Sequence, residues 1–300
     1  MTVKLATLGE CLIEISEVDT KTNENIKKFA YGGDVLNTSV YLSRNNIKTS
    51  FISALGNDIN SQWLLKEWQK ENIDCSHVQK LEGYYPGLYM IELDDIGERS
   101  FMYWRNNSAA KNFFENIPLL KKTLRNIKDF NYIYFSGITL AIMSQEVRDY
   151  FINYLKKFRQ NGGKVIFDSN YRPILWKTQY QAKYNYTKAY KNCDIALPTY
   201  DDEKLLFNYK TKKECVQAIQ KKGVKDIVLK LGKDGCFYLE EDKQVLVSTG
   251  KVKSIDTTGA GDSFNAGYIA AIINGKDKNN ACKYGNSIAK DVIRKKGAII

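Results

Sequence analysis

A glycine-rich turn followed by an aspartate is the segment of this 300-residue chain best suited to carry chemistry. Residues 256–264 read Asp-Thr-Thr-Gly-Ala-Gly-Asp-Ser-Phe, and the apolar run that begins at Phe264 predicts a buried helix. Glycines at a helix N-terminus let main-chain N–H groups converge on one point, and the helix dipole adds partial positive charge there. The segment therefore predicts an anion-binding site with Asp262 at its edge.

Asp262 is the candidate general base. A carboxylate beside helix-terminal amides is expected to stay ionised at neutral pH and to accept the proton of a hydroxyl nucleophile. Phosphoryl transfer needs such a base, together with donors for the charge on the transferring phosphate. The alternative is that Asp262 simply caps the helix. The segment is not a dinucleotide fingerprint, since Phe264 stands at the third glycine position, and the chain has no Gly-x-x-x-x-Gly-Lys-Ser/Thr loop.

Two further segments could hold a ligand with hydroxyl and acid groups. Gly33, the second of two adjacent glycines, precedes a predicted helix that carries Asn37 one turn later. Tyr103 and Arg105 are two residues apart in a predicted strand and share a face, with Tyr89 in the partner strand. A guanidinium beside phenol hydroxyls suits a carboxylate-bearing ligand. The alternatives are a plain strand-to-helix turn and a solvated arginine beside packed aromatic rings.

Two more candidates follow predicted strands. Arg172 lies just after the buried strand 164–168, and ligands of open α/β folds bind beyond the carboxyl ends of strands. Arg172 is therefore a second candidate for an anionic group. The segment Lys-Leu-Gly-Lys-Asp-Gly at 230–235 also joins a strand to a glycine turn. This turn could wrap a nucleotide, or it could be an ordinary hairpin turn.

Strands and helices alternate along the chain, which predicts a mostly parallel sheet with helices on both faces, a Rossmann-like α/β fold in one domain over 1–300. The predicted helices cover 35–44, 62–71 and the run from 264. The predicted strands are 3–8, 50–55, 132–136, 164–168, 194–197, 227–230 and 251–255. Two aromatic-rich segments, about 12–33 and 84–106, interrupt the pattern. The second contains two strands, 88–93 and 99–103, around a turn at 94–98. These segments predict a small antiparallel β-sheet that stands off the main sheet as a lid, with an ordinary edge extension of the main sheet as the alternative.

Composition argues against a nucleic-acid-binding, a zinc-binding and a membrane-spanning protein. The net charge is +11, but the lysines are scattered among acidic residues, which favours a solvated surface over a nucleic-acid-binding patch. The six cysteines form no Cys-x-x-Cys pair and His77 is the only histidine, which argues against a zinc cage. No apolar stretch approaches the roughly 20 residues of a membrane span. We expect a cytoplasmic protein without membrane or nucleic-acid partners.

The chain resembles the ribokinase-like sugar kinases over essentially its whole length. The family signature Asp-Thr-x-Gly-Ala-Gly-Asp-x-Phe is present at 256–264, and so is the double glycine at 32–33. Within the family the likeness is strongest to members that phosphorylate 2-keto-3-deoxygluconate. The strings that carry it are Tyr-Gly-Gly-Asp-Val-Leu-Asn-Thr at 31–38, Tyr-Trp-Arg at 103–105, Ser-Ala-Ala-Lys at 108–111, Phe-Asp-Ser-Asn-Tyr-Arg-Pro at 167–173 and Lys-Gly-Ala-Ile-Ile at 296–300.

The resemblance implies ATP-dependent phosphorylation of 2-keto-3-deoxygluconate at its terminal C6 hydroxyl, with Mg²⁺, and a lid that can also join the subunits of a homo-oligomer. Asp262 would be the base and the amides of Gly259, Ala260 and Gly261 the anion hole. The sugar acid would be held by Gly33, Asn37, Tyr89, Tyr103, Arg105 and Arg172. The nucleotide would be lined by Asn170, Thr199, Lys230, Gly232, Gly235 and Asn286.

One departure from the family pattern affects the metal side of the site. The usual Asn-x-x-Glu appears here as Thr199-Tyr200-Asp201-Asp202, with Glu203 following, so that Asp202 is in register as a possible metal ligand and Glu203 is not. Two other functions stay open. The first is a kinase for a neutral sugar such as fructose or ribose. The second, suggested by the charge alone, is a non-catalytic sugar sensor or nucleic-acid binder.

Overall fold

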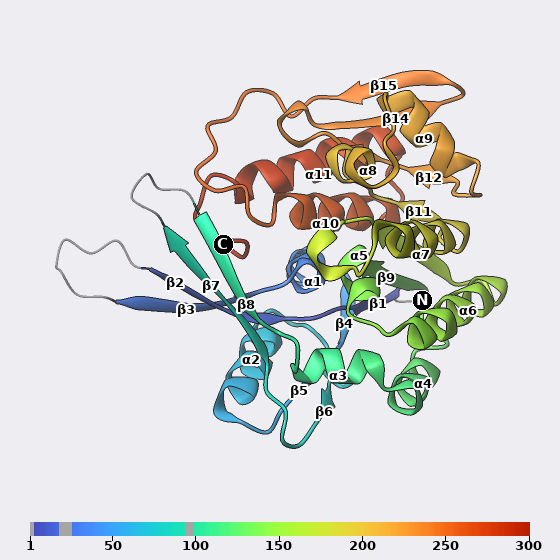
Figure 1. Cartoon of the computed structure of the whole chain (residues 1–300). Helices are drawn as coiled ribbons and strands as arrows, with labels where there is room; N and C mark the ends of the chain where they lie inside the picture. The colour runs from blue at the N-terminus through green and yellow to red at the C-terminus, as the bar shows by residue number, and fades with distance from the viewer. Residues whose placement is uncertain (1–2, 18–25, 94–98) are drawn as a thin grey trace.

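Six parallel strands form the centre of the molecule in the computed structural model, which describes residues 3–17, 26–93 and 99–300. Their order across the sheet is β12-β11-β10-β9-β1-β4 (Figure 1). Their bounds are β1 Lys4–Leu8, β4 Lys48–Ile52, β9 Tyr132–Ser136, β10 Lys164–Asp168, β11 Ile195–Ala196 and β12 Asp226–Ile227. The predicted parallel α/β sheet is confirmed.

The sheet separates two apolar cores because successive strand residues point to opposite faces. In β10, Val165 and Phe167 belong to one core, and Ile166 between them belongs to the other. In β9, Ile133 packs into the first core and Tyr134 into the second. Strands buried on both faces need helices on both sides, as the repeated strand–helix pattern predicts.

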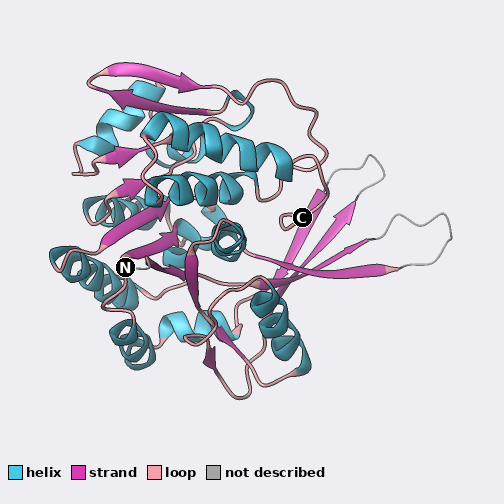
Figure 2. Cartoon of the chain, turned by 180° about the vertical axis from the view of Figure 1, so that it is seen from behind, coloured by secondary structure: helices cyan, strands magenta, loops and turns pink. Residues whose placement is uncertain are grey.

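The helices divide between these two cores (Figures 1 and 2). One core takes side chains from α1 Asp34–Arg44, α2 Ile59–Lys70, α10 Ala260–Ile273 and α11 Lys278–Val292. The other takes side chains from α3 Ala109–Glu115, α4 Ile117–Asn126, α5 Gly137–Ala141, α6 Gln145–Gln160, α7 Gln179–Lys191, α8 Tyr200–Phe207 and α9 Lys212–Gln220. No helix in the described part of the chain has the length and apolar character that crossing a bilayer requires.

A four-stranded sheet projects from the body as the predicted lid (Figures 1 and 2). It is built from β2 Leu12–Glu17, β3 Lys27–Gly32, β7 Gly87–Leu93 and β8 Arg99–Trp104, in the order β3-β2-β7-β8. The two outer pairs are antiparallel as predicted, but β2 and β7 run parallel, so the prediction of an antiparallel sheet is wrong for the central pair. The predicted turn at 94–98 lies outside the described residues, and a contact between subunits through the lid stays a prediction.

Several boundaries differ from the predicted ones. The predicted strand at 251–255 is wrong: the segment forms no strand, and the Ile255 N–H donates instead to the Ile293 carbonyl at 2.7 Å. The run 227–230 splits between β12 and β13 Leu229–Lys230, and β13 belongs to a separate antiparallel sheet with β14 Cys236–Glu240 and β15 Lys243–Val247. The run 50–55 splits likewise into β4 and β5 Ala54–Leu55, which pairs with β6 Gln79–Lys80. Helix α2 begins before residue 62 because the Asp58 side chain caps it.

Candidate active site

A cavity of about 420 Å³ lies where the carboxyl ends of the central strands face the lid. Asp262 and both candidate arginines, Arg105 and Arg172, are on its wall. So are the other predicted sugar-binding residues, Gly33, Asn37, Tyr89 and Tyr103. Residues from four distant parts of the sequence are thus brought to one cavity.

Asp262 lies in the first turn of α10 and faces helix α1. Helix α10 has Gly259 as its N-cap, so Asp262 does not occupy the capping position. Its carboxylate accepts a hydrogen bond of 2.8 Å from Asn37 Nδ2, and the Thr38 hydroxyl donates to its main-chain oxygen at 3.2 Å. Helix α1 therefore fixes the aspartate from one side and leaves its carboxylate on the cavity wall.

The expectation that Asp262 is comfortably ionised at neutral pH is wrong. The pKa of Asp262 is raised to about 7. Burial is the largest cause, and the negative charge of Asp34 is the next. Asp168 acts in the same direction, whereas the hydrogen bond from Asn37 and the positive charge of Lys230 lower the pKa. A carboxyl with a pKa near neutrality is better matched to proton transfer than one that is fully ionised.

The glycine turn before α10 has a conformation that depends on its first glycine. Gly259 has a φ of 74°, and a Cβ added there would lie 2.9 Å from the Ala298 Cβ. The Tyr41 hydroxyl holds this neighbouring segment by donating to the Ala298 carbonyl at 2.8 Å. The Ala260 amide donates to the Thr257 carbonyl at 3.2 Å, so the predicted anion hole rests mainly on the amides of its two glycines.

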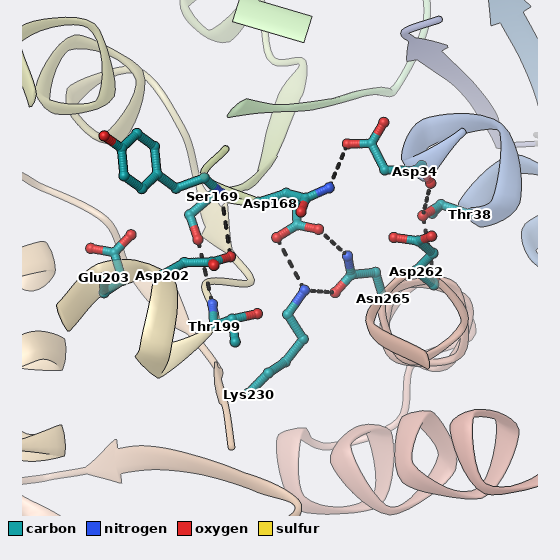
Figure 3. A network of polar contacts seen from close by, with 12 residues as sticks. Asp34, Thr38, Asp168, Ser169, Thr199, Asp202, Glu203, Lys230, Asp262 and Asn265 are labelled. Atoms are coloured by element: carbon teal, nitrogen blue, oxygen red, sulfur yellow. Dashed lines mark hydrogen bonds and ion pairs between the residues drawn. The ribbon is translucent and has the colours of Figure 1, made fainter. Parts of the chain in front are cut away.

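A buried cation lies beside this turn (Figure 3). Lys230, at the end of β13, has only 7% of its surface exposed, and its ammonium donates to Asp168 and Asn265 at 3.0 Å each. Asn265 completes the triangle by donating to Asp168 at 2.8 Å. Sequence reasoning missed Asn265, although it follows Asp262 by three residues and so shares its side of the helix.

A second cavity, of about 840 Å³, adjoins the first. Of the residues expected to line the nucleotide, Gly232, Gly235 and Asn286 lie on its wall, as do Lys212, Lys233, Lys251 and Lys290, whose charges suit a polyanion. The two cavities share four wall residues, namely Lys230, Thr257, Ala260 and Gly261. The glycine turn therefore forms part of the boundary between the two cavities.

Asn170 and Thr199 are not on the wall of that second cavity. Both line the first, because they follow β10 and β11, whose carboxyl ends point there. Asn170 donates to the Asp34 carboxylate at 2.7 Å, and the Thr199 amide donates to the Ser169 hydroxyl at 3.4 Å.

The two acidic residues at the start of α8 point to different surroundings. Asp202 lines the first cavity, where it accepts from the Tyr171 amide at 3.3 Å, and burial raises its pKa. Glu203 is buried in the core against the Tyr190 hydroxyl, and burial raises its pKa to about 7. Within the described ranges no cluster of three or more acidic, histidine or cysteine side chains could hold a metal. Mg²⁺ commonly binds through one or two carboxylates, substrate phosphates and water, so Asp202 fits that ion.

The lid side of the first cavity contains an acid that sequence reasoning missed. Glu10, just after β1, accepts hydrogen bonds from Arg105 Nη2 and from the Ser108 hydroxyl. Its position directly beyond a strand end was the available signal. Tyr89 donates to Glu14, and Tyr103, which is half exposed, lies with its ring centroid 5.8 Å from that of Tyr89.

Several known proteins are similar to this chain in sequence and in fold. The chain is 41% identical to a 2-dehydro-3-deoxygluconokinase from Escherichia coli and 40% identical to one from Dickeya dadantii, over 100% of this chain and 98% of each relative. Its structure is similar to that of a 2-dehydro-3-deoxygluconokinase from Thermotoga maritima, with a TM-score of 0.87 at 19% identity, covering 99% of this chain and 96% of that one. Residues 3–300 match the description "pfkB family carbohydrate kinase". The chain belongs to the pfkB family of carbohydrate kinases, the ribokinase-like sugar kinases that its glycine turn and paired glycines predict.

Proposed function

We propose that this kinase transfers the γ-phosphoryl group of ATP to the C6 hydroxyl of 2-keto-3-deoxygluconate, giving 2-keto-3-deoxy-6-phosphogluconate and ADP. The observation that carries the proposal is the single cavity in which Asp262 shares a wall with Arg105 and Arg172. A base for a hydroxyl and guanidinium groups for an acid, on the wall of one cavity, match a sugar acid. The relatives at about 40% identity, named for this substrate under its other name, support the same choice.

The proposed chemical step uses few groups of the protein. Asp262 accepts the proton of the C6 hydroxyl as its oxygen attacks the γ-phosphorus and the bond to the β-phosphate oxygen breaks. The amides of Gly259 and Gly261, with the nearby Lys230 ammonium, hold the charge that develops on the transferring group. Mg²⁺ would be held by Asp202 and would neutralise phosphate charge.

The two cavities divide the substrates in this proposal. The sugar acid occupies the first cavity, with its carboxylate toward the two arginines and its hydroxyls toward Asn37, Tyr89 and Tyr103. The nucleotide occupies the second cavity, and its phosphates reach the shared wall at the glycine turn. Asn170 and Thr199 then belong with the phosphate end of the first cavity, where they lie beside Asp34 and Ser169.

An assay of ATP consumption over a small panel of acceptors tests the function directly. The panel contains 2-keto-3-deoxygluconate, its galactonate epimer, fructose and ribose. We expect the highest kcat/KM on a 2-keto-3-deoxy sugar acid. A kcat/KM on fructose or ribose equal to or above that on the acids would contradict the proposed substrate class and favour a neutral-sugar kinase.

Arg105→Ala is expected to raise the KM for 2-keto-3-deoxygluconate by about 10- to 100-fold, because a charge-assisted bond to the acid group is lost. We expect any turnover of fructose to change much less, since fructose has no carboxylate. Steady-state kinetics on both acceptors measures this difference. An equal loss on both would show that Arg105 does not read the acid group.

The pH dependence of kcat is expected to follow the ionisation of Asp262. Its pKa is about 7, and only the deprotonated carboxylate accepts a proton, so kcat should fall about tenfold for each pH unit below that pKa and level off above it. Asn37→Leu removes a hydrogen bond that lowers this pKa, so the midpoint should move to higher pH. Profiles of kcat at saturating substrates, from pH 5 to 9, measure both midpoints. A midpoint that stays fixed in the variant would exclude Asp262 as the titrating group.

A further inference from the structure

Glu10 is a buried carboxylate on the wall of the sugar cavity. It is 3% exposed, and both of its oxygens already accept hydrogen bonds from the protein. Ser108 Oγ donates to Oε1 at 2.6 Å, and Arg105 Nη2 donates to Oε2 at 2.5 Å. The acid therefore ties the connection after β1 to the segment between the lid strand β8 and helix α3.

The surroundings of Glu10 are packed closely enough to fix its orientation. A Cβ added at Gly87 would lie 3.3 Å from Glu10 Oε1 and 3.2 Å from the Arg105 Cβ. A Cβ added at Gly33 would overlap the Glu10 carbonyl oxygen. Ser108 is itself held, because its hydroxyl accepts from the Lys111 amide as the N-cap of α3. Gly87 and the helix cap thus restrict the carboxylate, and Gly33 gives room to the main chain of Glu10.

The guanidinium of Arg105 has one hydrogen-bond partner, Glu10, among the described residues. Its side chain is 12% exposed, and Glu10 takes one Nη2 hydrogen bond. Its Nε is buried, and no acceptor in the described part of the chain reaches it. A buried donor without a partner is unfavourable, so the guanidinium relies on its hydrogen bond to Glu10 to hold it in place. The arginine side chain lines that cavity.

We propose that Glu10 is a positioning residue that holds the guanidinium of Arg105 at the cavity wall, where it binds the acid group of the substrate. In this proposal Glu10 acts on specificity through Arg105, and not by a contact of its own with the sugar acid. A preoriented guanidinium loses less conformational freedom when it binds a carboxylate. The inference rests on the proposed function, because it assumes a substrate with a carboxylate.

Glu10→Ala tests the inference through the split between KM and kcat. We expect the KM for 2-keto-3-deoxygluconate to rise on the order of 10- to 100-fold, with kcat and the KM for fructose within about threefold of wild type. Glu10→Gln can still accept from Arg105 and bond to Ser108, so it should restore most of the affinity. If Glu10→Ala does not fold, Ser108→Ala frees one oxygen of Glu10 and should raise the same KM by about threefold to tenfold.

A double-mutant cycle separates positioning from direct contact. If Glu10 acts through Arg105, Glu10→Ala combined with Arg105→Ala should be no worse than Arg105→Ala alone. Asp194→Ala is the matched control. Asp194 accepts hydrogen bonds of 3.0 and 3.1 Å from Arg159, and it lies just before β11, at the opposite end of the sheet from the cavity. Its loss should not alter the KM for the sugar acid.

Four results would overturn the inference: an unchanged KM in Glu10→Ala, an equal rise for fructose, a Glu10→Gln variant as weak as Glu10→Ala, or additive effects in the cycle. Wild-type protein that does not phosphorylate the acid would instead reject the proposed function itself. The two failures are therefore distinguishable.

Discussion

Asp262→Asn is expected to lower kcat by a factor of about 10² to 10⁴ while nucleotide binding is largely retained. The amide is nearly isosteric with the carboxylate and can still bond to Asn37, so the geometry of α1 and α10 should persist. The variant cannot accept the proton of the attacking hydroxyl. It also removes a negative charge close to Asp34 and Asp168, which would relieve repulsion and stabilise the fold slightly.

Two measurements on the purified variant separate catalysis from binding. Single-turnover kinetics gives the rate of phosphoryl transfer, and titration calorimetry with ATP gives the affinity. Asp201→Asn is the control, because Asp201 is an exposed acid on α8, next to Asp202, and does not line the cavity. A kcat equal to that of wild type in Asp262→Asn would show that Asp262 is not the base. A loss of ATP affinity with an unchanged rate of phosphoryl transfer would show instead that Asp262 binds the nucleotide.

Lys230→Met is expected to reduce the free energy of unfolding by about 3–5 kcal/mol, the typical cost of leaving one partner of a buried ion pair uncompensated. The Lys230 and Asp168 side chains are 8% and 2% exposed, so water cannot replace the missing cation. The same change removes a positive charge beside the glycine turn, where the Lys230 Nζ lies 3.5 Å from the position of a Cβ built on Gly261. We therefore expect kcat to fall as well.

Urea denaturation of wild type and variant measures the loss of stability. Lys188→Met is the matched control: its partner Asp149 lies at 2.7 Å, but the two side chains are 32% and 43% exposed. Screening by water limits that pair to about 0–1 kcal/mol. Replacing Asp168 together with Lys230 by apolar residues should recover part of the stability, because no charge is then left unpaired. If Lys230→Met lost less free energy of unfolding than Lys188→Met, the argument from burial would be contradicted.

Much of the fold follows from local patterns. The alternation of apolar runs and helical segments predicts the parallel sheet, and strands β9 and β10 have the predicted bounds because both are continuous buried runs. Prediction from the sequence is less accurate where a short segment has a partner far along the chain. Residues 251–255 read as a strand, but they lie beside the end of α11 and pair with no strand there.

The sequence by itself determined the chemistry available to this protein: an aspartate after a glycine turn at a helix start, one arginine beside the tyrosines of the lid and another after a buried strand, and a lid rich in aromatic residues. Only the tertiary structure decided how those groups behave. Burial beside Asp34 raises the pKa of Asp262, and Glu10, 95 positions away in the chain, orients Arg105. The physical reason is that electrostatic and hydrogen-bond energies depend on distance and burial in space, which sequence spacing does not encode.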